Sequence, residues 1–201
     1  MSVFDVSRYQ PENRLQELVD GGNCDGVIIK LGEWYNKEAG GEIDLDQMFV
    51  VHVNEAVRLG IPYGIYIMSR AENAEEAMHE AQWVNDRVAE LLNGEEPKLG
   101  VWFDLERPQV KRNNIYGDVK EAMNALSSWW NTKHVGIYAS YNYFYDYLDV
   151  EDMRANNTPI WLAQYNGKNS MDDDGYPNIV LWQFTTHDNY QDENEWYGFK
   201  D

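Results

Sequence analysis

The sequence predicts an α/β protein whose strands close into a barrel, and three observations support this fold class. Short apolar segments alternate with segments of helical periodicity through the first four units of the 201-residue chain, which is typical of a parallel sheet. Residues 27–29 are apolar on both faces, as in a sheet that is covered on both sides. Seven segments have the pattern of strands, and an eighth near the C-terminus would complete a barrel.

Strands and helices alternate regularly through the first half of the chain. Pro11 suits the first turn of a helix, and Gly21 suits its end. Gly60 ends the second helix in the same way. Asn73 and Glu76 form a start to the third helix that resembles a capping box. The predicted strands of this half are 2–7, 25–33 and 63–69, and the predicted helices are 11–19, 45–59 and 73–93, with a polar loop at 34–44.

The second half contains strands with little helix between them. Its predicted strands are 101–106, 134–140, 159–165 and 179–184, with a helix at 114–130, a short aromatic turn or helix at 141–148 and a loop at 172–175. A full barrel with eight helices typically needs about 250 residues, so we expect a barrel that lacks several helices in this half. A doubly wound open sheet is the alternative, although no glycine-rich phosphate loop follows the first strand. We expect residues 1–201 to form a single domain.

The composition excludes several classes of function. The formal net charge is −19, which argues against nucleic acid and against anionic membranes as partners. A hydrophobic content of 43% indicates a globular protein. No segment is long and apolar enough to span a membrane, and the N-terminus shows no signal peptide. Cys24 is the only cysteine, so no internal disulfide can form.

The strand at 101–106 carries the most informative side chains. Its alternation places Val101, Phe103 and Leu105 on one face and the two carboxyl groups of Asp104 and Glu106 on the other, about 7 Å apart along the strand. Because an unpaired buried charge is costly, acids at a strand end usually face a cleft.

Four acids are expected at the carboxyl ends of the strands, where the active site of a barrel lies: Asp5, Glu33, Asp104 and Glu106. We expect no lysine or arginine at the same strand ends. Crowded like charges raise the pKa of at least one carboxyl group, which leaves a protonated acid beside an ionised one. Glycoside hydrolysis uses such a pair.

Aromatic and polar residues on or near the strands fit a carbohydrate substrate, because aromatic rings contact the flat face of a sugar and polar groups bond to its hydroxyls. The candidates are Tyr66, Tyr138, Trp161, Gln164 and Trp182. The four histidines show no metalloprotease spacing, and the acidic loop at 172–175 lacks the downstream glutamate of a calcium loop. We therefore expect neither a metal nor a cofactor.

Several motifs occur in an order that resembles the lysozymes of glycoside hydrolase family 25, which are N-acetylmuramidases from bacteria, phages and fungi. The motifs are FDVSRYQ at 4–10, GIY at 64–66, FDLE at 103–106, GIY at 136–138, WLAQY at 161–165, WQF at 182–184 and DENEWYG at 192–198. The resemblance covers essentially the whole chain. Its D-x-E motif is weak alone, but the ordered set is specific.

The resemblance implies a modified TIM-like barrel of eight strands with about five helices. It implies cleavage of the β-1,4 bond between N-acetylmuramic acid and N-acetylglucosamine in bacterial cell-wall peptidoglycan, by a monomer. Glu106 takes the place of the general acid/base, and Asp104 that of a second acid that either orients the acetamido group of the substrate or acts more directly. Asp5 and Asp192 take the places of acids that line the cleft. The chain departs from the family pattern around Glu33, which affects contacts with the substrate.

Two other interpretations remain open. A non-catalytic domain that binds cell-wall glycan, or a phage structural domain, could share this fold, and the acidic surface favours it because bacterial walls are themselves anionic. An unrelated barrel glycosidase acting on chitin is the other. A muramidase would act on the cell wall, either outside the cell or after release from the host cytoplasm by a phage lysis system.

Overall fold

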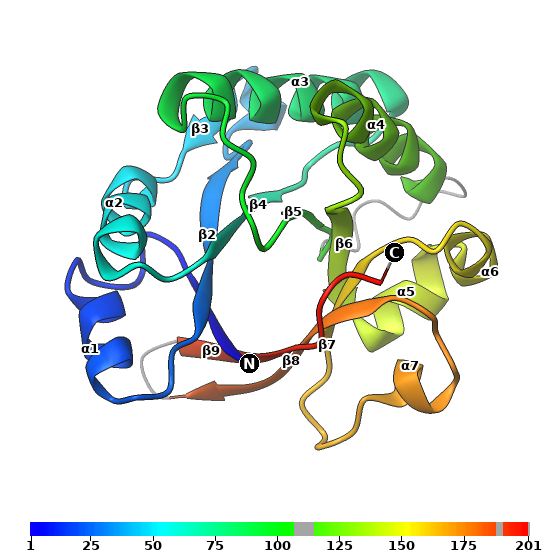
Figure 1. The fold of residues 1–201 in the computed structure, drawn as a ribbon. Helices are drawn as coiled ribbons and strands as arrows, with labels where there is room; N and C mark the ends of the chain where they lie inside the picture. The colour runs from blue at the N-terminus through cyan, green and yellow to red at the C-terminus, as the bar shows by residue number, and fades with distance from the viewer. Residues whose placement is uncertain (107–114, 188–190, 201) are drawn as a thin grey trace.

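The computed structural model describes residues 1–106, 115–187 and 191–200. Within them, eight strands form a closed barrel in the order β1-β9-β8-β7-β6-β5-β4-β2, and β2 pairs with β1 to close it (Figure 1). The strands are β1 (Ser2–Val6), β2 (Gly26–Glu33), β4 (Tyr63–Met68), β5 (Val101–Asp104), β6 (Val135–Ser140), β7 (Ile160–Ala163), β8 (Ile179–His187) and β9 (Gln191–Trp196). The predicted barrel is confirmed, and the open-sheet alternative is wrong.

The barrel is mixed and not wholly parallel. Seven of its described strands run parallel to one another, whereas β9 runs antiparallel to both of its neighbours, β8 and β1. Only three residues separate β8 from β9 in the chain, and a parallel crossover needs a dozen or more. The short connection therefore determines the direction of the last strand.

The described residues contain seven α-helices, against the five or so that we expected. They are α1 (Arg14–Asp20), α2 (Phe49–Leu59), α3 (Ala74–Leu91), α4 (Ile115–Trp130), α5 (Tyr141–Tyr147), α6 (Val150–Ala155) and α7 (Ser170–Asp173), with a 3₁₀ turn η1 (Lys37–Ala39). The unexpected α6 and α7 have six and four residues, too few for a helical period to be visible in the sequence. The predicted start of α4 at Asn114 lies outside the described residues.

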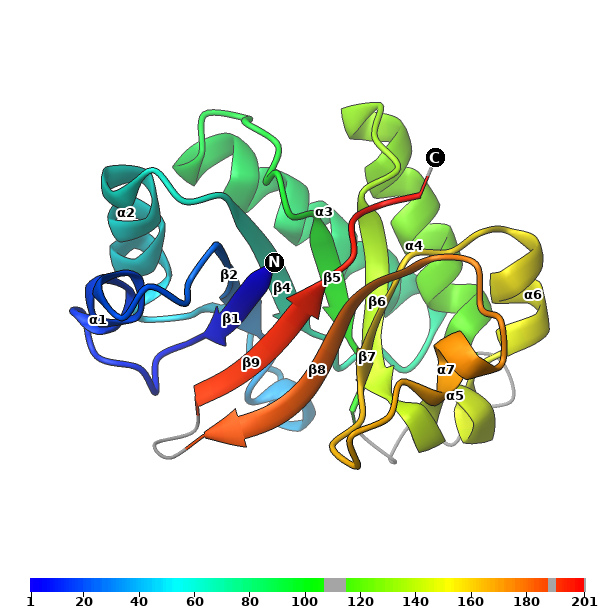
Figure 2. The ribbon, with the colours of Figure 1, turned by 60° about the horizontal axis from the view of Figure 1, so that its bottom comes forward.

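The helices cover the barrel unevenly. In Figures 1 and 2, α1 to α4 pack around β1 to β6, whereas no helix lies over the outer face of β8 and β9. The second half holds four of the seven described α-helices, so helices are not missing there as we expected, but α5, α6 and α7 have only seven, six and four residues. None of the described helices is long and apolar enough to cross a membrane.

The second helix begins four residues later than predicted. Leu45 belongs to β3 (Asp44–Leu45), which pairs antiparallel with the end of β2. Asp46 then turns the chain, since its carboxylate accepts hydrogen bonds from the backbone N–H groups of Met48 at 2.9 Å and Arg8 at 3.1 Å. The local bonding of this aspartate outweighs the helical pattern around it.

The interior of the barrel is filled with aromatic rings in its lower half. Trp102 and Trp161 are fully buried there and meet edge to face, with their ring centroids 6.0 Å apart. Phe199 stacks on Trp102 at 5.8 Å. Apolar residues on the opposite strand faces, such as Val101 and Phe103, pack outward against the helices. Because the lower half is filled, only the mouth at the carboxyl ends of the parallel strands can hold a cleft.

Gly136 on β6 allows Trp102 to lie across the barrel. A Cβ atom at Gly136 would lie 2.5 Å from the Trp102 ring and 2.6 Å from the carbonyl oxygen of Pro159. Gly136→Ala is therefore expected to lower the free energy of unfolding by about 1–3 kcal/mol through overpacking, measured by chemical denaturation. The matched variant Gly21→Ala, where the nearest atoms lie at 3.3 Å, should change it by less than about 1 kcal/mol. Equal effects of the two variants would contradict this explanation.

Glu80 is a fully buried acid on α3 below the segment that follows β4. Its carboxylate accepts hydrogen bonds from Ser69 Oγ at 2.6 Å and from the Arg70 backbone N–H at 2.7 Å. Burial raises the pKa of Glu80 to about 8, so the folded state holds a proton that the unfolded state releases near pH 4.5.

The free energy of unfolding should therefore decrease as pH rises from about 4.5 through 8, because the unfolded state binds fewer protons over that range. Glu80→Gln removes this ionisation, and its stability should vary less with pH between 5 and 9 than that of the wild type. Denaturant unfolding at both pH values measures the difference. Parallel pH profiles of the two proteins would contradict the assignment.

Candidate active site

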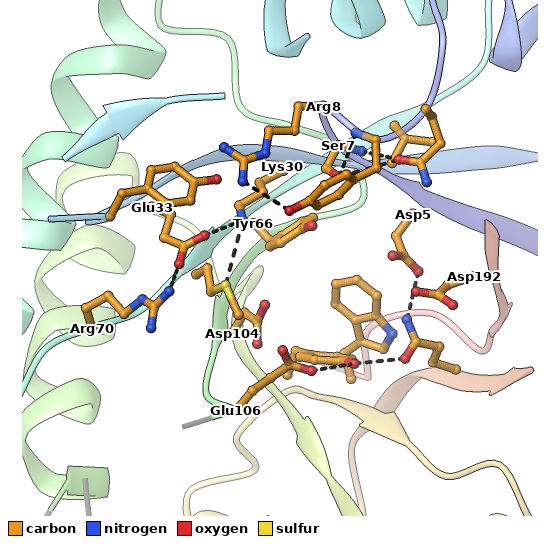
Figure 3. A pocket seen from close by; sticks show the side chains of 18 residues that line it. Asp5, Ser7, Arg8, Lys30, Glu33, Tyr66, Arg70, Asp104, Glu106 and Asp192 are labelled. Carbon is orange, nitrogen blue, oxygen red and sulfur yellow. Dashed lines mark hydrogen bonds and ion pairs between the residues drawn. The ribbon is translucent and has the colours of Figure 1, made fainter. Parts of the chain in front are cut away.

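A cleft of about 800 Å³ lies at the carboxyl ends of the parallel strands. All eight barrel strands line it directly, and the segments that follow β1, β2, β4 and β5 contribute the rest (Figure 3). Most of the acids and aromatic residues that the sequence singled out reach this cleft, although they come from strands far apart in the chain.

Strand β5 brings Asp104 and Glu106 to the cleft, as its alternation predicts. Asp104 lies level with Met68 of β4 and Tyr138 of β6, and its side chain is buried in the floor. Its Oδ1 atom has no hydrogen-bond partner among the described residues. Glu106 lies two residues further on, where it is exposed at the rim.

Both carboxyl groups of this pair have a raised pKa. For Asp104 the main cause is burial, followed by the negative charges of Glu106 and Asp5, which outweigh the nearby ammonium group of Lys30. The pKa of Glu106 is raised because the walls of the cleft displace water around it and Asp192 adds a negative charge. The crowding of acids in the cleft therefore acts with burial to raise the pKa of both carboxyl groups above their ordinary values.

Asp5 on β1 is the third acid of the cleft, and two amides hold it. Its Oδ2 atom accepts hydrogen bonds of 2.9 Å from both Gln183 Nε2 and Asn194 Nδ2. Burial and the neighbouring charge of Asp192 raise the pKa of Asp5 to about 7, although both amides oppose that shift. Asp5 therefore titrates in the physiological range.

Asn194 is held in turn by the barrel interior. Its Oδ1 accepts a 2.6 Å hydrogen bond from Trp161 Nε1, and its amide also donates to the carbonyl oxygen of Val3. We did not predict a role for Asn194. Asn194 belongs to the motif at 192–198. It lies two residues after Asp192, so strand alternation places both side chains on the same face, and this spacing could have identified it.

Tyr138 joins the two acidic sides of the cleft. Its hydroxyl lies 2.8 Å from Gln183 Oε1 and 3.3 Å from Glu106 Oε1, and Gln183 Oε1 also accepts a hydrogen bond from Tyr165. The hydrogen bond from Tyr138 favours the ionised form of Glu106 and so lowers its pKa, against the larger effect of burial. A continuous polar network thus connects Glu106 to Asp5.

Tyr66, Trp161 and Asp192 also line the cleft. Tyr66 meets Trp161 edge to face, with ring centroids 6.1 Å apart. Asp192 on β9 lies opposite Asp5 on β1 and accepts a 2.6 Å hydrogen bond from Thr186. The structure therefore brings the predicted acids and three of the predicted aromatic residues together in one cleft.

The expected absence of basic residues at the mouth is wrong. Glu33 lines the cleft but is buried in an ion pair with Lys30, whose Nζ lies 2.7 Å away, and in a second ion pair with Arg70. Lys30 points inward because it follows the inward-facing Ile28 at the strand period of two. Arg70 arrives from the segment after β4, which sequence spacing could not place.

Two predicted substrate-binding residues do not line the cleft. Trp182 packs on the outer face of β8 and donates a 3.0 Å hydrogen bond to the carbonyl oxygen of Gln164, while its neighbour Gln183 faces inward. The side-chain amide of Gln164 bonds instead to Ser170, at 2.8 Å to Oγ and 2.9 Å from the backbone N–H, and anchors α7.

The arrangement can perform proton transfer beside a buried carboxylate. A rim acid with a raised pKa can donate a proton to a bound molecule, and a buried acid nearby can stabilise positive charge or accept a hydrogen bond. Among the described residues, no group of three or more histidine, cysteine or acidic side chains is arranged to hold a metal ion.

Solved structures share this fold. The autolysin LytC of Streptococcus pneumoniae superposes with a TM-score of 0.80 at 19% identity over 98% of this chain, which spans only 46% of LytC. The muramidase of Trichobolus zukalii gives 0.76 at 19% identity, with 98% of this chain and 94% of that one covered. The catalytic domain of endolysin ply40 from Listeria monocytogenes bacteriophage P40 gives 0.68 at 20% identity, with 96% and 91% covered.

The comparison of sequences is more specific than that of structures. A search of curated proteins finds no significant match to this chain. The family model described as glycosyl hydrolases family 25, however, matches residues 4–193, which include every acid of the cleft. The chain therefore belongs to glycosyl hydrolase family 25.

Proposed function

We propose that the protein is an N-acetylmuramidase whose catalytic domain is residues 1–201. It hydrolyses the β-1,4 bond between N-acetylmuramic acid and N-acetylglucosamine in the peptidoglycan of the bacterial cell wall. The observation that carries the proposal is the pair of acids at the end of β5, with Asp104 buried in the floor of the cleft and Glu106, two residues beyond it, exposed at the rim. Family membership supports the reaction class, and a solved structure of LytC contains a synthetic peptidoglycan ligand.

Glu106 is the general acid and base in this proposal. Its position at the rim leaves it accessible to the oxygen of a glycosidic bond, and its raised pKa favours the protonated form that must donate to that oxygen. Once the leaving sugar has departed, the same carboxylate can accept a proton from water.

Asp104 acts through the substrate in this proposal. Asp104 and Glu106 are two residues apart at the end of β5 and lie on the same side of a bound sugar, so they cannot easily attack from opposite faces of the ring. Asp104 Oδ1, a buried acceptor with no hydrogen-bond partner among the described residues, can instead accept the N–H of the 2-acetamido group. The acetamido oxygen then bonds to C1 as the glycosidic bond breaks, and water displaces it in the second step.

The walls of the cleft supply the sugar contacts. Tyr66, Tyr138 and Trp161 present aromatic surface and polar tips, and Asp5 and Asp192 present hydrogen-bond acceptors on the opposite side. Glu33 is neutralised by its two cations, so we assign it to the support of the cleft wall. The site of action is the cell wall, reached by secretion or by release through a phage lysis system.

Glu106→Gln is expected to lower kcat about 10²- to 10⁴-fold, because it removes the proton donor while keeping the size of the side chain. Release of reducing ends from purified peptidoglycan measures this, and borohydride reduction identifies the new ends as muramic acid. Glu195→Gln, an exposed acid outside the cleft, is the matched control and should retain full activity.

Three results would overturn parts of this assignment. Near-normal activity of Glu106→Gln would exclude its catalytic role. New glucosamine ends would keep a glycosidase but change the bond that is cleaved. Absence of release from several wall types by the wild type would favour a domain that only binds glycan.

Tyr138→Phe is expected to shift the alkaline limb of the pH profile of kcat/KM to higher pH. The lost hydroxyl stabilises the carboxylate of Glu106, so its removal should raise the pKa of Glu106 further and keep the acid protonated at higher pH. Tyr145→Phe, which loses a hydrogen bond to Asp174 away from the cleft, should leave the limb in place. A downward shift for Tyr138→Phe would contradict the proposed direction.

A further inference from the structure

The cleft has two ends of opposite charge. Figure 3 shows Arg8, Lys30, Glu33 and Arg70 at one end, called the cationic end here, and Asp5, Glu106 and Asp192 at the other. Among the described lining residues, the charged side chains of the cationic end are three cations and one carboxylate. The charged side chains of the other end are all carboxylates. A positive region is unusual in a protein of formal net charge −19.

Arg8 is the cation of this end whose guanidinium forms no ion pair with a described carboxylate, although Asp46 accepts a hydrogen bond from its backbone N–H. Lys30 and Arg70 share Glu33. The other arginines of the described residues each have a carboxylate within 4.0 Å: Arg14, Arg58, Arg70, Arg87 and Arg154. Within the described part of the chain, no carboxylate lies in ion-pair distance of the Arg8 guanidinium, although acids outnumber bases about two to one in the sequence.

Two tyrosines hold the Arg8 side chain in place. The centre of its guanidinium lies 4.6 Å from the Tyr35 ring centroid and 5.1 Å from that of Tyr9, and its Nη2 donates a 3.0 Å hydrogen bond to the Tyr9 hydroxyl. Tyr9 is 67% exposed, so this ring has little packing of its own to account for its position. Cation–π contacts with both rings reduce the freedom that the guanidinium would lose on binding a ligand.

A pre-oriented guanidinium with free N–H groups is suited to a carboxylate, which it can bind with two parallel hydrogen bonds. The glycan backbone itself is uncharged, so the acid must be on a substituent. In peptidoglycan the lactyl ether of muramic acid provides one, either as its own carboxylate or through the carboxylates of the attached peptide. Chitin, the substrate of the rival glycosidase interpretation, has no such group.

We propose that Arg8, positioned by its contacts with Tyr9 and Tyr35, forms a subsite for a carboxylate on the muramic acid substituent. The subsite rests on the proposed muramidase function and deepens it, because it selects muramyl substrates over neutral glycans. It also allows an acidic protein to bind an anionic substrate, since the cationic end faces the charged substituent while the glycan lies against the acids.

Binding of small, uncleavable ligands tests the subsite separately from catalysis. The probes are N-acetylglucosamine, N-acetylmuramic acid with its lactyl carboxylate, and muramyl dipeptide with a peptide carboxylate, each titrated at low salt and followed by NMR. We expect the wild type to bind at least one of the two acidic probes about 10-fold more tightly than N-acetylglucosamine, as a charge-assisted bidentate pair at a partly exposed site allows. A preference for muramic acid alone identifies the lactyl carboxylate as the ligand, and a preference for the dipeptide alone identifies the peptide.

Arg8→Gln should abolish the preference and leave the affinity for N-acetylglucosamine unchanged. Arg8 is exposed, so this variant should fold normally. Arg87→Gln, which removes an arginine paired with Glu90 on α3, should retain the preference. Equal affinity of the wild type for all three probes, or a preference that persists in Arg8→Gln, would overturn the subsite. Because no probe is cleaved, an active Glu106→Gln variant would overturn the catalytic assignment without affecting this result.

Discussion

Closure of the barrel by β9 is the interaction on which the cleft depends. This strand forms the only described bridge between β8 and β1, and it pairs antiparallel with both, so that the last strand of the chain lies beside the first. Backbone hydrogen bonds on both sides leave β1 and β8 without open edges. The pairing also sets Asn194 and Asp192 beside Asp5, and through Gln183 it extends the polar network to Tyr138 and Glu106. The two ends of the sequence thus build one wall of the site.

Burial and charge then determine what the acids of the cleft can do. Aromatic rings fill the lower barrel, so the carboxyl groups at its mouth lie on an apolar base with little water beneath them. Such a setting raises the pKa values of Asp5, Asp104 and Glu106, whereas the amides, Tyr138 and Lys30 limit the rise. The cleft thus has an end lined by acids and a cationic end, and Glu33 belongs to the cationic end by its ion pairs although it is an acid.

Local pattern was sufficient where one strand or helix decides the outcome. The alternation predicted for 101–106 placed Asp104 and Glu106 correctly at the cleft, although β5 ends at Asp104. Half of the predicted capping box is present: the Asn73 side chain accepts a hydrogen bond from the Glu76 backbone N–H, but the Glu76 carboxylate accepts from the Glu72 backbone N–H instead of that of Asn73. Short sequence patterns also led to two wrong predictions of secondary structure. Leu45 has a helical context but joins β3, because Asp46 bonds to neighbouring backbone groups, and the four-residue α7 is shorter than a helical period can reveal.

The sequence by itself determined the fold class, the face of β5 that bears the acids and the family to which the chain belongs, because each is written in spacing or in ordered motifs. The tertiary structure alone decided which charges meet. Glu33 pairs with Lys30 and Arg70, Arg8 contacts the rings of Tyr9 and Tyr35, and Trp182 faces outward. Each outcome depends on the register between strands and on the path of the segments that join them. Electrostatic interactions act through distances in space, and spacing along the chain does not encode those distances across a barrel.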